Sequence, residues 1–284
     1  MMQRWSRVGT AARGRLQWLS TKRRFLLGAT TCSGGCLAMG TMHFGVLPTL
    51  PPPFGQYVNR SERWLKKQPP AILQILAANT IVFAMWRLPA LQTMMYRNFT
   101  CSFASLASGR IHTTLTSVFS HQGFFHFGLN MYALTSFAPV LVDIMGHAQF
   151  LQFYVGSGIA SSLASCSLQA AHYTVRRSAY VLSRPGLGAS GAVFAMLAVW
   201  GQLFPDLKLH VIFAPFISFH AGDLLPALVT FDIAGSLYGF VRDSPLGHGA
   251  HLGGMACGYL MFDWLSKHNQ KVIWWNKKHH RSRF

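Results

Sequence analysis

Long apolar runs separated by short polar or charged breaks make up most of this chain. The run at 25–59 carries no charge, and its first part, 25–47, is long enough to cross a membrane as a helix. Several prolines then end any helix there, since proline breaks the backbone hydrogen-bond ladder. The later apolar runs predict six further membrane helices, at 70–88, 111–142, 144–172, 188–204, 224–240 and 247–265.

Two connections have a mixed character. Residues 89–110 are too polar to cross a membrane yet rich in Leu, Met and Phe, which favours a loop with short interfacial helices. Residues 209–219 form a short apolar piece that we expect to be strand-like or re-entrant. No connection is long enough to hold a soluble domain, so any chemistry must take place within the membrane. The predicted fold is all-α: a polytopic membrane helix bundle with a six-helix core preceded by one extra transmembrane helix.

The composition supports this interpretation. Of the 284 residues, 51% are hydrophobic and 11% are charged, whereas a soluble domain carries about 25% charged residues. The formal net charge is +18, and the basic residues lie at the chain ends and in short connections. Such a distribution fits contact with a lipid bilayer and topology signals rather than binding of nucleic acid. Five scattered cysteines argue against a disulfide framework.

The N-terminal residues predict a cellular location. Residues 1–24 contain seven arginines and lysines, several Ser and Thr, and no acid, which is typical of a mitochondrial targeting segment; the alternative is a basic flank that orients the first helix. The predicted organisation is a targeting or matrix leader at 1–24, the extra transmembrane helix with a Pro-rich linker at 25–69, the six-helix core at 70–266 and a basic tail at 267–284. We expect a multi-pass protein of the mitochondrial inner membrane.

A serine and a histidine stand at the heads of two glycine-notched apolar runs. Ser190 lies in the sequence Gly188-Ala189-Ser190-Gly191, and His251 shares one helix face with Gly254 and Gly258. Glycines on such a face let two helix backbones approach closely. Packing of the two runs would bring the serine hydroxyl within hydrogen-bond reach of the imidazole, the minimum arrangement for nucleophilic hydrolysis.

Three further residues extend this candidate site. Ser190 begins a helix, where unpaired N–H groups and the helix dipole favour a negative oxygen. Phe194, one turn later, is placed to contact the imidazole ring. His126 and Asn130 share a face of another apolar helix and are suitable donors to an oxyanion. The alternative is that Asn130 bonds a neighbouring helix and His126 is an ordinary core histidine.

Other catalytic chemistries fit less well. No His-Glu-x-x-His motif occurs, and the sole glutamate, Glu62, lies outside the apolar runs, which excludes a zinc protease of that type. His248 and His251 lack an evident third ligand, so we expect no metal and no cofactor. Asp223 and Asp232 lack a Gly-x-Gly-Asp setting, which argues against an aspartyl protease.

The acids raise a separate question. Asp232 interrupts an apolar run and must face protein or water, because a carboxylate at lipid depth is costly. The sequence suggests no acid placed to orient His251, since Asp243 lies two helical turns before it and outside the run.

Taken together and in order, these motifs resemble the rhomboid family of intramembrane serine proteases over about residues 70–266. The matching stretches are His126-x-x-x-Asn130, Gly188-Ala189-Ser190-Gly191 and Ala250-His251-Leu252-Gly253-Gly254-x-x-x-Gly258. The extra first helix and basic leader are similar to the mitochondrial, presenilin-associated rhomboid-like branch.

The resemblance implies a mechanism without a required carboxylate. Ser190 would be the nucleophile and His251 the general base, while His126, Asn130 and the Ser190 backbone N–H would hold the oxyanion. Gly188, Gly191, Phe194, Gly254 and Gly258 would support the site. The implied substrates are single-span membrane proteins.

Two departures from the family pattern stand out. Where the family often has a Trp-Arg pair, this chain has Ile111-His112-Thr113-Thr114, and Phe194 replaces a tyrosine common in bacterial members. The main alternative function is a catalytically silent relative that binds membrane helices in quality control. A third hypothesis is a transporter. Against it, the polar groups lie on three helices instead of forming a path through the membrane.

Overall fold

The structure is a computed structural model that describes residues 67–211, 214–242 and 247–273. The leader at 1–24, the predicted first span at 25–47, most of the linker up to residue 69 and the end of the tail lie outside the described residues. The longer helices are α3 (Pro70–Met85), α7 (Phe124–Met145), α8 (His147–Arg176), α10 (Ser190–Leu203), α11 (Ala221–Tyr238) and α12 (His248–His268). The shorter elements are η1 (Pro89–Leu91), α4 (Gln92–Asn98), α5 (Phe103–Ala107), α6 (Thr113–Thr116), η2 (Ser117–Phe119), α9 (Ala179–Ser183), β1 (Lys208–Val211) and β2 (Ala214–His220).

The chain forms two compact units. Of the described residues, the smaller unit contains 209–211 and 214–217, and the larger contains the rest. Strands β1 and β2 pair in a two-stranded sheet, so the strand-like structure expected at 209–219 is confirmed.

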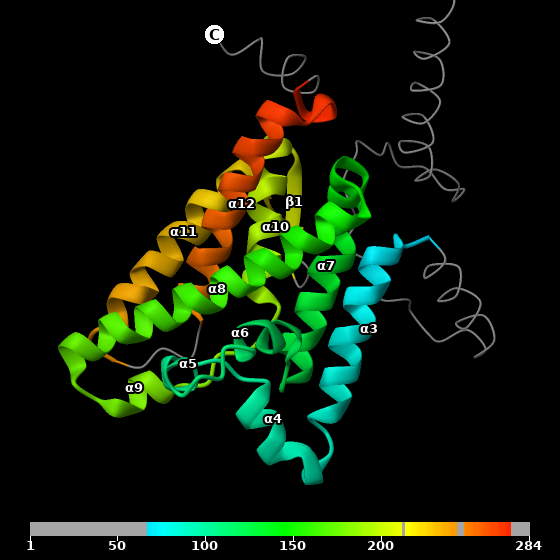
Figure 1. Cartoon of the computed structure of the whole chain (residues 1–284). Coiled ribbons are helices and arrows are strands. Elements are labelled where there is room, and N and C mark those ends of the chain that lie inside the picture. The colour runs from blue at the N-terminus through cyan, green and yellow to red at the C-terminus, as the bar shows by residue number, and fades with distance from the viewer. Residues whose placement is uncertain (1–66, 212–213, 243–246, 274–284) are drawn as a thin grey trace, which may run out of the picture. The chain divides into compact units, whose positions relative to one another are not determined.

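Helix α10 is the centre of the larger unit. It packs against α7, α8, α11 and α12, and α12 packs in turn against α8 and α11 (Figure 1). Small residues make this possible, because Ala192, Ala195 and Ala198 on α10 are fully buried. Each of the six helices expected from residue 70 onward overlaps one of the longer helices of the structure.

The start of the predicted span at 111–142 was wrong. Its first part forms α6, η2 and a turn, and α7 begins only at Phe124. The reason is local: the hydroxyls of Thr113 and Thr114 donate to backbone carbonyls three residues earlier, which favours short turns over a continuous helix. Ser120, at the end of η2, accepts a 2.7 Å hydrogen bond from the Trp86 indole.

Hydropathy alone identifies few of these helices as membrane spans. Among the described helices, α7 by itself is long and apolar enough to cross a membrane, and α3 qualifies only together with η1 and α4, across a bend of 97°. Helix α10 is apolar but has 14 residues. Helix α8 is long, but its serines lower its mean hydropathy.

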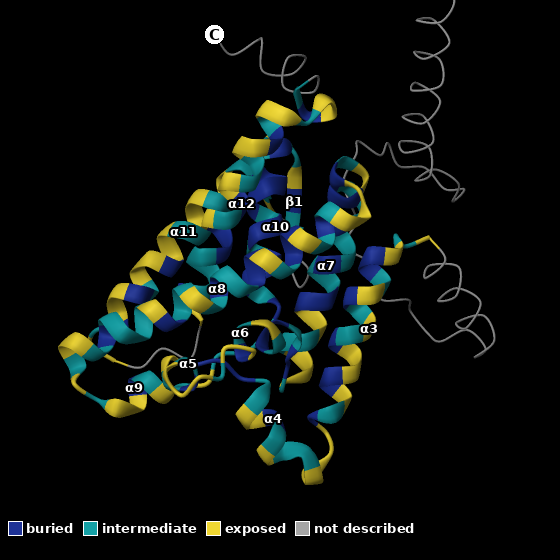
Figure 2. Cartoon of the chain, viewed as in Figure 1, coloured by how far each residue is buried: buried dark blue, intermediate teal, exposed yellow. Residues whose placement is uncertain are grey.

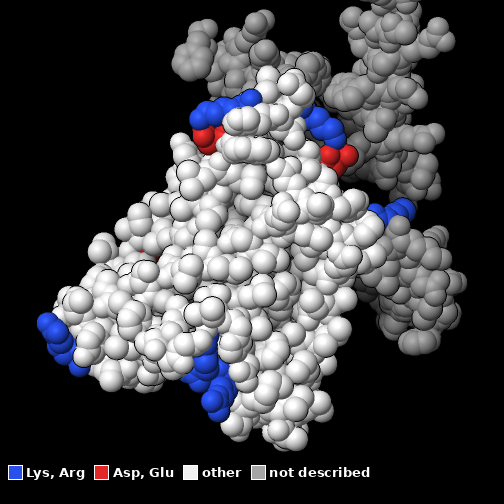
Figure 3. Space-filling model, in the orientation of Figure 1, with Lys and Arg blue, Asp and Glu red and all other residues white. Residues whose placement is uncertain are grey.

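The outer faces nevertheless suit a lipid environment. Beyond its first turn, α11 exposes mostly apolar side chains (Figure 2). Phe231 and Leu237 are more than half exposed, whereas the carboxylate of Asp232 is fully buried. On the face shown in Figure 3, charged side chains gather towards the ends of the helices and leave the middle almost uncharged. This is the pattern expected of helices whose polar groups face the interior.

Candidate active site

The segment before α10 is fixed by backbone hydrogen bonds. Gly186 exchanges two of them with Cys101, at 2.8 and 2.7 Å, and the Gly188 N–H donates to the Ser117 carbonyl at 2.9 Å. Gly188 has a φ of +128°, which disfavours any residue with a side chain. These contacts hold Ser190 at the first position of α10.

The same contacts dock the loop between α3 and α7, although this loop has no Trp-Arg pair at 111–114. The Cys101–Gly186 bridge ties the loop to the serine segment. The ring Nε2 of His112 lies 3.1 Å from the Asn98 side-chain oxygen, and the Thr116 hydroxyl donates to the Asn98 carbonyl. The Cys101–Gly186 bridge therefore docks the loop on the serine segment, and the contacts of Asn98 brace the loop internally.

Glycines bring α12 onto α10. A Cβ on Gly254 would lie 2.0 Å from the Gly191 carbonyl oxygen, and one on Gly258 would lie 2.2 Å from that of Ala195. A Cβ on Gly191 would also collide with Ser161 of α8, at 2.4 Å. The absence of side chains at these positions allows the close approach that the sequence suggested.

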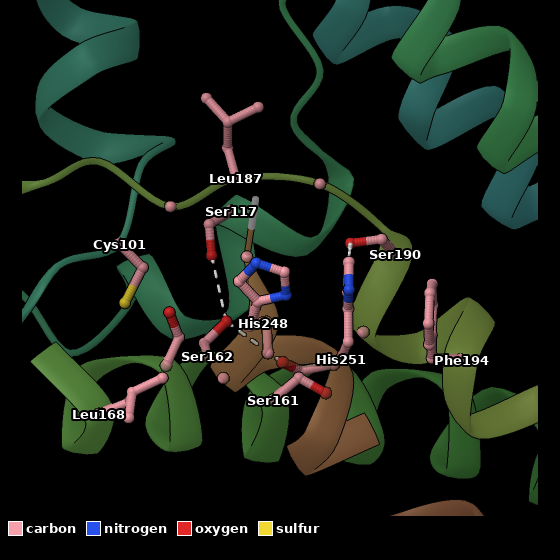
Figure 4. Close-up of a pocket in the computed structure, with 18 of the residues that line it drawn as sticks. Cys101, Ser117, Ser161, Ser162, Leu168, Leu187, Ser190, Phe194, His248 and His251 are labelled. Atoms are coloured by element: carbon pink, nitrogen blue, oxygen red, sulfur yellow. Dashed lines mark hydrogen bonds between the residues drawn. The ribbon is translucent and has the colours of Figure 1, made fainter. Parts of the chain in front are cut away.

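The close approach joins the serine to the histidine. The His251 Nε2 lies 3.2 Å from the Ser190 Oγ, and the hydroxyl points towards the ring (Figure 4). The Phe194 ring stacks on the His251 imidazole with centroids 4.0 Å apart and planes 6° apart. The stacking restricts the tilt of the imidazole, which keeps the His251 Nε2 directed at the Ser190 Oγ.

An acid does face His251, so the expectation that none is placed to orient it was wrong. The Asp232 Oδ1 lies 3.1 Å from the His251 Nδ1, and the carboxylate is fully buried. An ionised carboxylate only accepts hydrogen bonds, so the His251 Nδ1 carries the proton and its Nε2 is the acceptor facing Ser190. Serine, histidine and carboxylate therefore lie in the order needed for proton transfer from serine to histidine.

One feature of the sequence points to this acid, since Asp232 is a lone carboxylate in an apolar run. The sequence does not show how α11 is rotated about its axis, and therefore which helix Asp232 faces. Asp232 faces α12, where a second histidine, His248, also contacts the Oδ1 through its Nδ1 at 2.7 Å.

His126 and Asn130 come from α7. Both line, together with Ser190 and His251, a cavity of about 730 Å³. A Cβ on Gly188 would lie 2.7 Å from the His126 Cε1, so this ring packs directly over the serine segment. The Asn130 amide donates to the His126 carbonyl at 2.8 Å, within its own helix, which leaves a second N–H on the same amide.

His121 has a role that the sequence did not suggest. Its Nε2 accepts a 3.2 Å hydrogen bond from the backbone N–H of Ala189, immediately before Ser190. His121 lies in the turn before α7 and is fully buried, and this burial lowers its pKa to about 3. The neutral ring therefore serves as a permanent acceptor for the serine segment.

Over the described ranges, no three His, Cys, Asp or Glu side chains gather in a way that would hold a metal ion. The cavity instead presents hydroxyls, including Ser161 and Ser162 of α8.

The fold and the site define a class: a mostly helical bundle with lipid-suited faces, in which a serine and a histidine line one cavity and a buried carboxylate faces the histidine. Residues 108–268 match the model of the Rhomboid domain. The chain belongs to the rhomboid family, whose members are polytopic membrane helix bundles and typically intramembrane serine proteases.

Relatives agree with this assignment. The chain is 37% identical over 204 residues to the human presenilin-associated rhomboid-like protein, mitochondrial, covering 72% of this chain and 49% of that protein. The cow protein of the same name is 36% identical over 206 residues, covering 72% and 50%. Rhomboid protein 1, mitochondrial, of Saccharomyces cerevisiae is 31% identical over 200 residues, covering 70% and 54%. The chain thus spans about half the length of the curated relatives it matches.

Proposed function

We propose that this chain is an intramembrane serine endopeptidase that cleaves single-span membrane proteins. One observation carries the proposal: the Ser190 Oγ lies 3.2 Å from an imidazole whose other nitrogen donates to a buried carboxylate. A serine hydroxyl is a weak nucleophile until an oriented base accepts its proton. The family membership supports the same activity.

The proposed chemistry follows the order of the contacts. The Ser190 Oγ attacks the substrate carbonyl carbon while the His251 Nε2 takes the hydroxyl proton. Asp232 accepts the hydrogen bond from the His251 Nδ1 and stabilises the imidazolium. The imidazolium then protonates the leaving amine, and a water molecule, activated by the same nitrogen, hydrolyses the acyl-enzyme.

The oxyanion needs donors on the other side of the carbonyl. The Ser190 backbone N–H is one of the first in α10 and has no carbonyl partner within its own helix. The His126 ring and the second N–H of Asn130 line the same cavity. We propose these three groups as the oxyanion hole; losing one such donor typically costs about 10²- to 10³-fold in rate.

We also propose the wider organisation expected from the sequence. It comprises a targeting leader at 1–24, an extra transmembrane helix within 25–69, the six-helix protease core at 70–266 and a basic tail from 267. The mitochondrial names of the relatives support a place in the mitochondrial inner membrane.

The test is cleavage of single-span reporters in liposomes. The wild-type chain should release a product whose ends are located by mass spectrometry, and Ser190→Ala and His251→Ala should release none while keeping the wild-type melting temperature. Retained cleavage by Ser190→Ala would refute the proposal. No cleavage by the wild type across several reporters with unstable helices would favour a silent relative that only binds membrane helices.

A further inference from the structure

Helices α11 and α12 meet through two matched pairs of residues. On α11, Asp232 and Gly235 lie three residues apart and share a face; on α12, His248 and His251 do the same. Both imidazoles direct Nδ1 at a single carboxylate oxygen, the Asp232 Oδ1, at 2.7 Å for His248 and 3.1 Å for His251. The shorter of the two contacts belongs to the histidine that is farther from the serine.

His248 is held in this position by its surroundings. Its ring edge lies over Gly235, where a Cβ would be 2.2 Å from both Cε1 and Nε2. The Phe231 ring contacts it edge-on at 5.5 Å, and the side chain of His248 is only 6% exposed. Any side chain at position 235 would therefore keep the His248 ring from reaching the Asp232 carboxylate.

We infer that His248 is a positioning residue for the reaction, because its Nδ1–H holds the Asp232 Oδ1 where that atom accepts the Nδ1–H of His251. The inference rests on the proposed function and adds a residue that acts on His251 through Asp232. A carboxylate on a helix has freedom about two side-chain torsions, and it can orient a base only if its own rotamer is fixed. The 2.7 Å hydrogen bond from His248 supplies this restraint to a fully buried carboxylate.

Two substitutions at position 248 separate positioning from packing. His248→Asn retains an N–H close to the place of Nδ1 but leaves a small void. His248→Leu fills a similar volume to the imidazole but has no donor. If His248 positions Asp232, Asn should preserve kcat better than Leu; if it only packs, Leu should be at least as good as Asn.

We expect His248→Leu to lower kcat roughly 10- to 100-fold with KM unchanged, the rate equivalent of one hydrogen bond to a charged group. Gly235→Ala should lower kcat in the same way, because the added methyl displaces the ring without altering it. Rates are compared per folded molecule, below the melting temperature of each variant.

The chain offers a matched control in His172. This buried histidine of α8 also rests on a glycine, Gly239, which directly follows α11 and where a Cβ would lie 2.3 Å from the His172 Cε1. The His172 Nε2 lies 2.9 Å from the Ser236 carbonyl oxygen. It contacts the same helix but not Asp232. His172→Leu should affect stability much as His248→Leu does, and leave kcat per folded molecule unchanged.

A spectroscopic readout keeps this test independent of activity. In a Ser190→Ala background with ¹⁵N-labelled histidine, the His251 Nδ1–H should give a downfield proton resonance because it donates to a carboxylate. His248→Leu should shift this resonance and His172→Leu should not. A His251 resonance unchanged by His248→Leu, or a kcat for the Leu variant equal to that of wild type, would overturn the inference. An inactive wild type would count against the proposed function alone, because the resonance would still report on His248.

Discussion

Replacing Gly254 with alanine perturbs the contact that brings the serine and the histidine together. The new Cβ would lie 2.0 Å from the Gly191 carbonyl oxygen, whereas ordinary van der Waals contact begins at 3.4 Å. The α10 and α12 backbones must therefore separate by up to about 1.4 Å (3.4 − 2.0). Gly191 follows Ser190 directly and Gly254 lies one turn after His251, so the separation is transmitted to a hydrogen bond that is already 3.2 Å long.

The expected loss follows from this geometry. Hydrogen bonds weaken beyond about 3.2 Å, and a misplacement of about 1 Å at a reacting centre can cost about 10²-fold in rate. We predict that Gly254→Ala lowers the rate of reporter cleavage by about this factor. The assay measures initial rates in liposomes, together with thermal unfolding of the same preparation.

Gly156→Ala is the matched control for this substitution. Gly156 lies within α8, and no atom would come within 4 Å of its added Cβ. This variant should cleave at the wild-type rate and be slightly more stable, since alanine is favoured over glycine in a helix by about 1 kcal/mol. Wild-type cleavage by Gly254→Ala would refute the argument that glycine packing sets the serine–histidine distance.

Three other predictions follow from named contacts. Asp232→Asn should lower kcat by at least about 10²-fold with little change in KM, because a neutral amide no longer stabilises the imidazolium; wild-type kcat would show that the carboxylate is dispensable. Burial lowers the pKa of His121 from 6.5 to about 3, so the free energy of unfolding should fall as the pH drops from 6.5 towards 3, where only the unfolded chain takes up this proton. His121→Asn lacks this group, so between pH 7 and pH 4 its free energy of unfolding should fall by up to about 3 kcal/mol less than that of wild type. Equal losses for the two proteins in chemical unfolding would contradict this. Cys101 and Cys166, whose sulfurs are 3.7 Å apart, should form an intramolecular disulfide under mild oxidation, while Cys257 stays unlinked. Peptide mapping would detect the disulfide. A link from Cys257 to either cysteine would contradict the placement of the loop on α8.

Much of the fold could be predicted because apolar runs and their breaks are local features. Gly146, with a φ of +83°, ends α7 where one run gives way to the next. The start of α7 could not be predicted in this way, because apolar residues continue through 111–123. There, side-chain hydrogen bonds and the contact between Trp86 and Ser120 decide against a helix.

In the candidate site, too, the local patterns could be predicted from the sequence and the contacts between distant segments could not. The approach of Ser190 to His251 could be predicted from small residues on the facing sides of the two helices, a periodic pattern that is visible in the sequence. The partnership of Asp232 with His251 depends on how α11 is rotated against α12, and the two residues are 19 positions apart. Likewise, the contact of His121 with the serine segment spans 68 positions and involves a backbone N–H, which no side-chain motif records.

The most direct test of the central claim is to trap the nucleophile. A serine-directed fluorophosphonate should add to the Ser190 Oγ in the active preparation, and mass spectrometry should locate the adduct on that residue. The account predicts that labelling and reporter cleavage are lost together in His251→Ala. An adduct on another cavity serine, such as Ser161 or Ser162, in a chain that cleaves the reporter without Ser190 would contradict it.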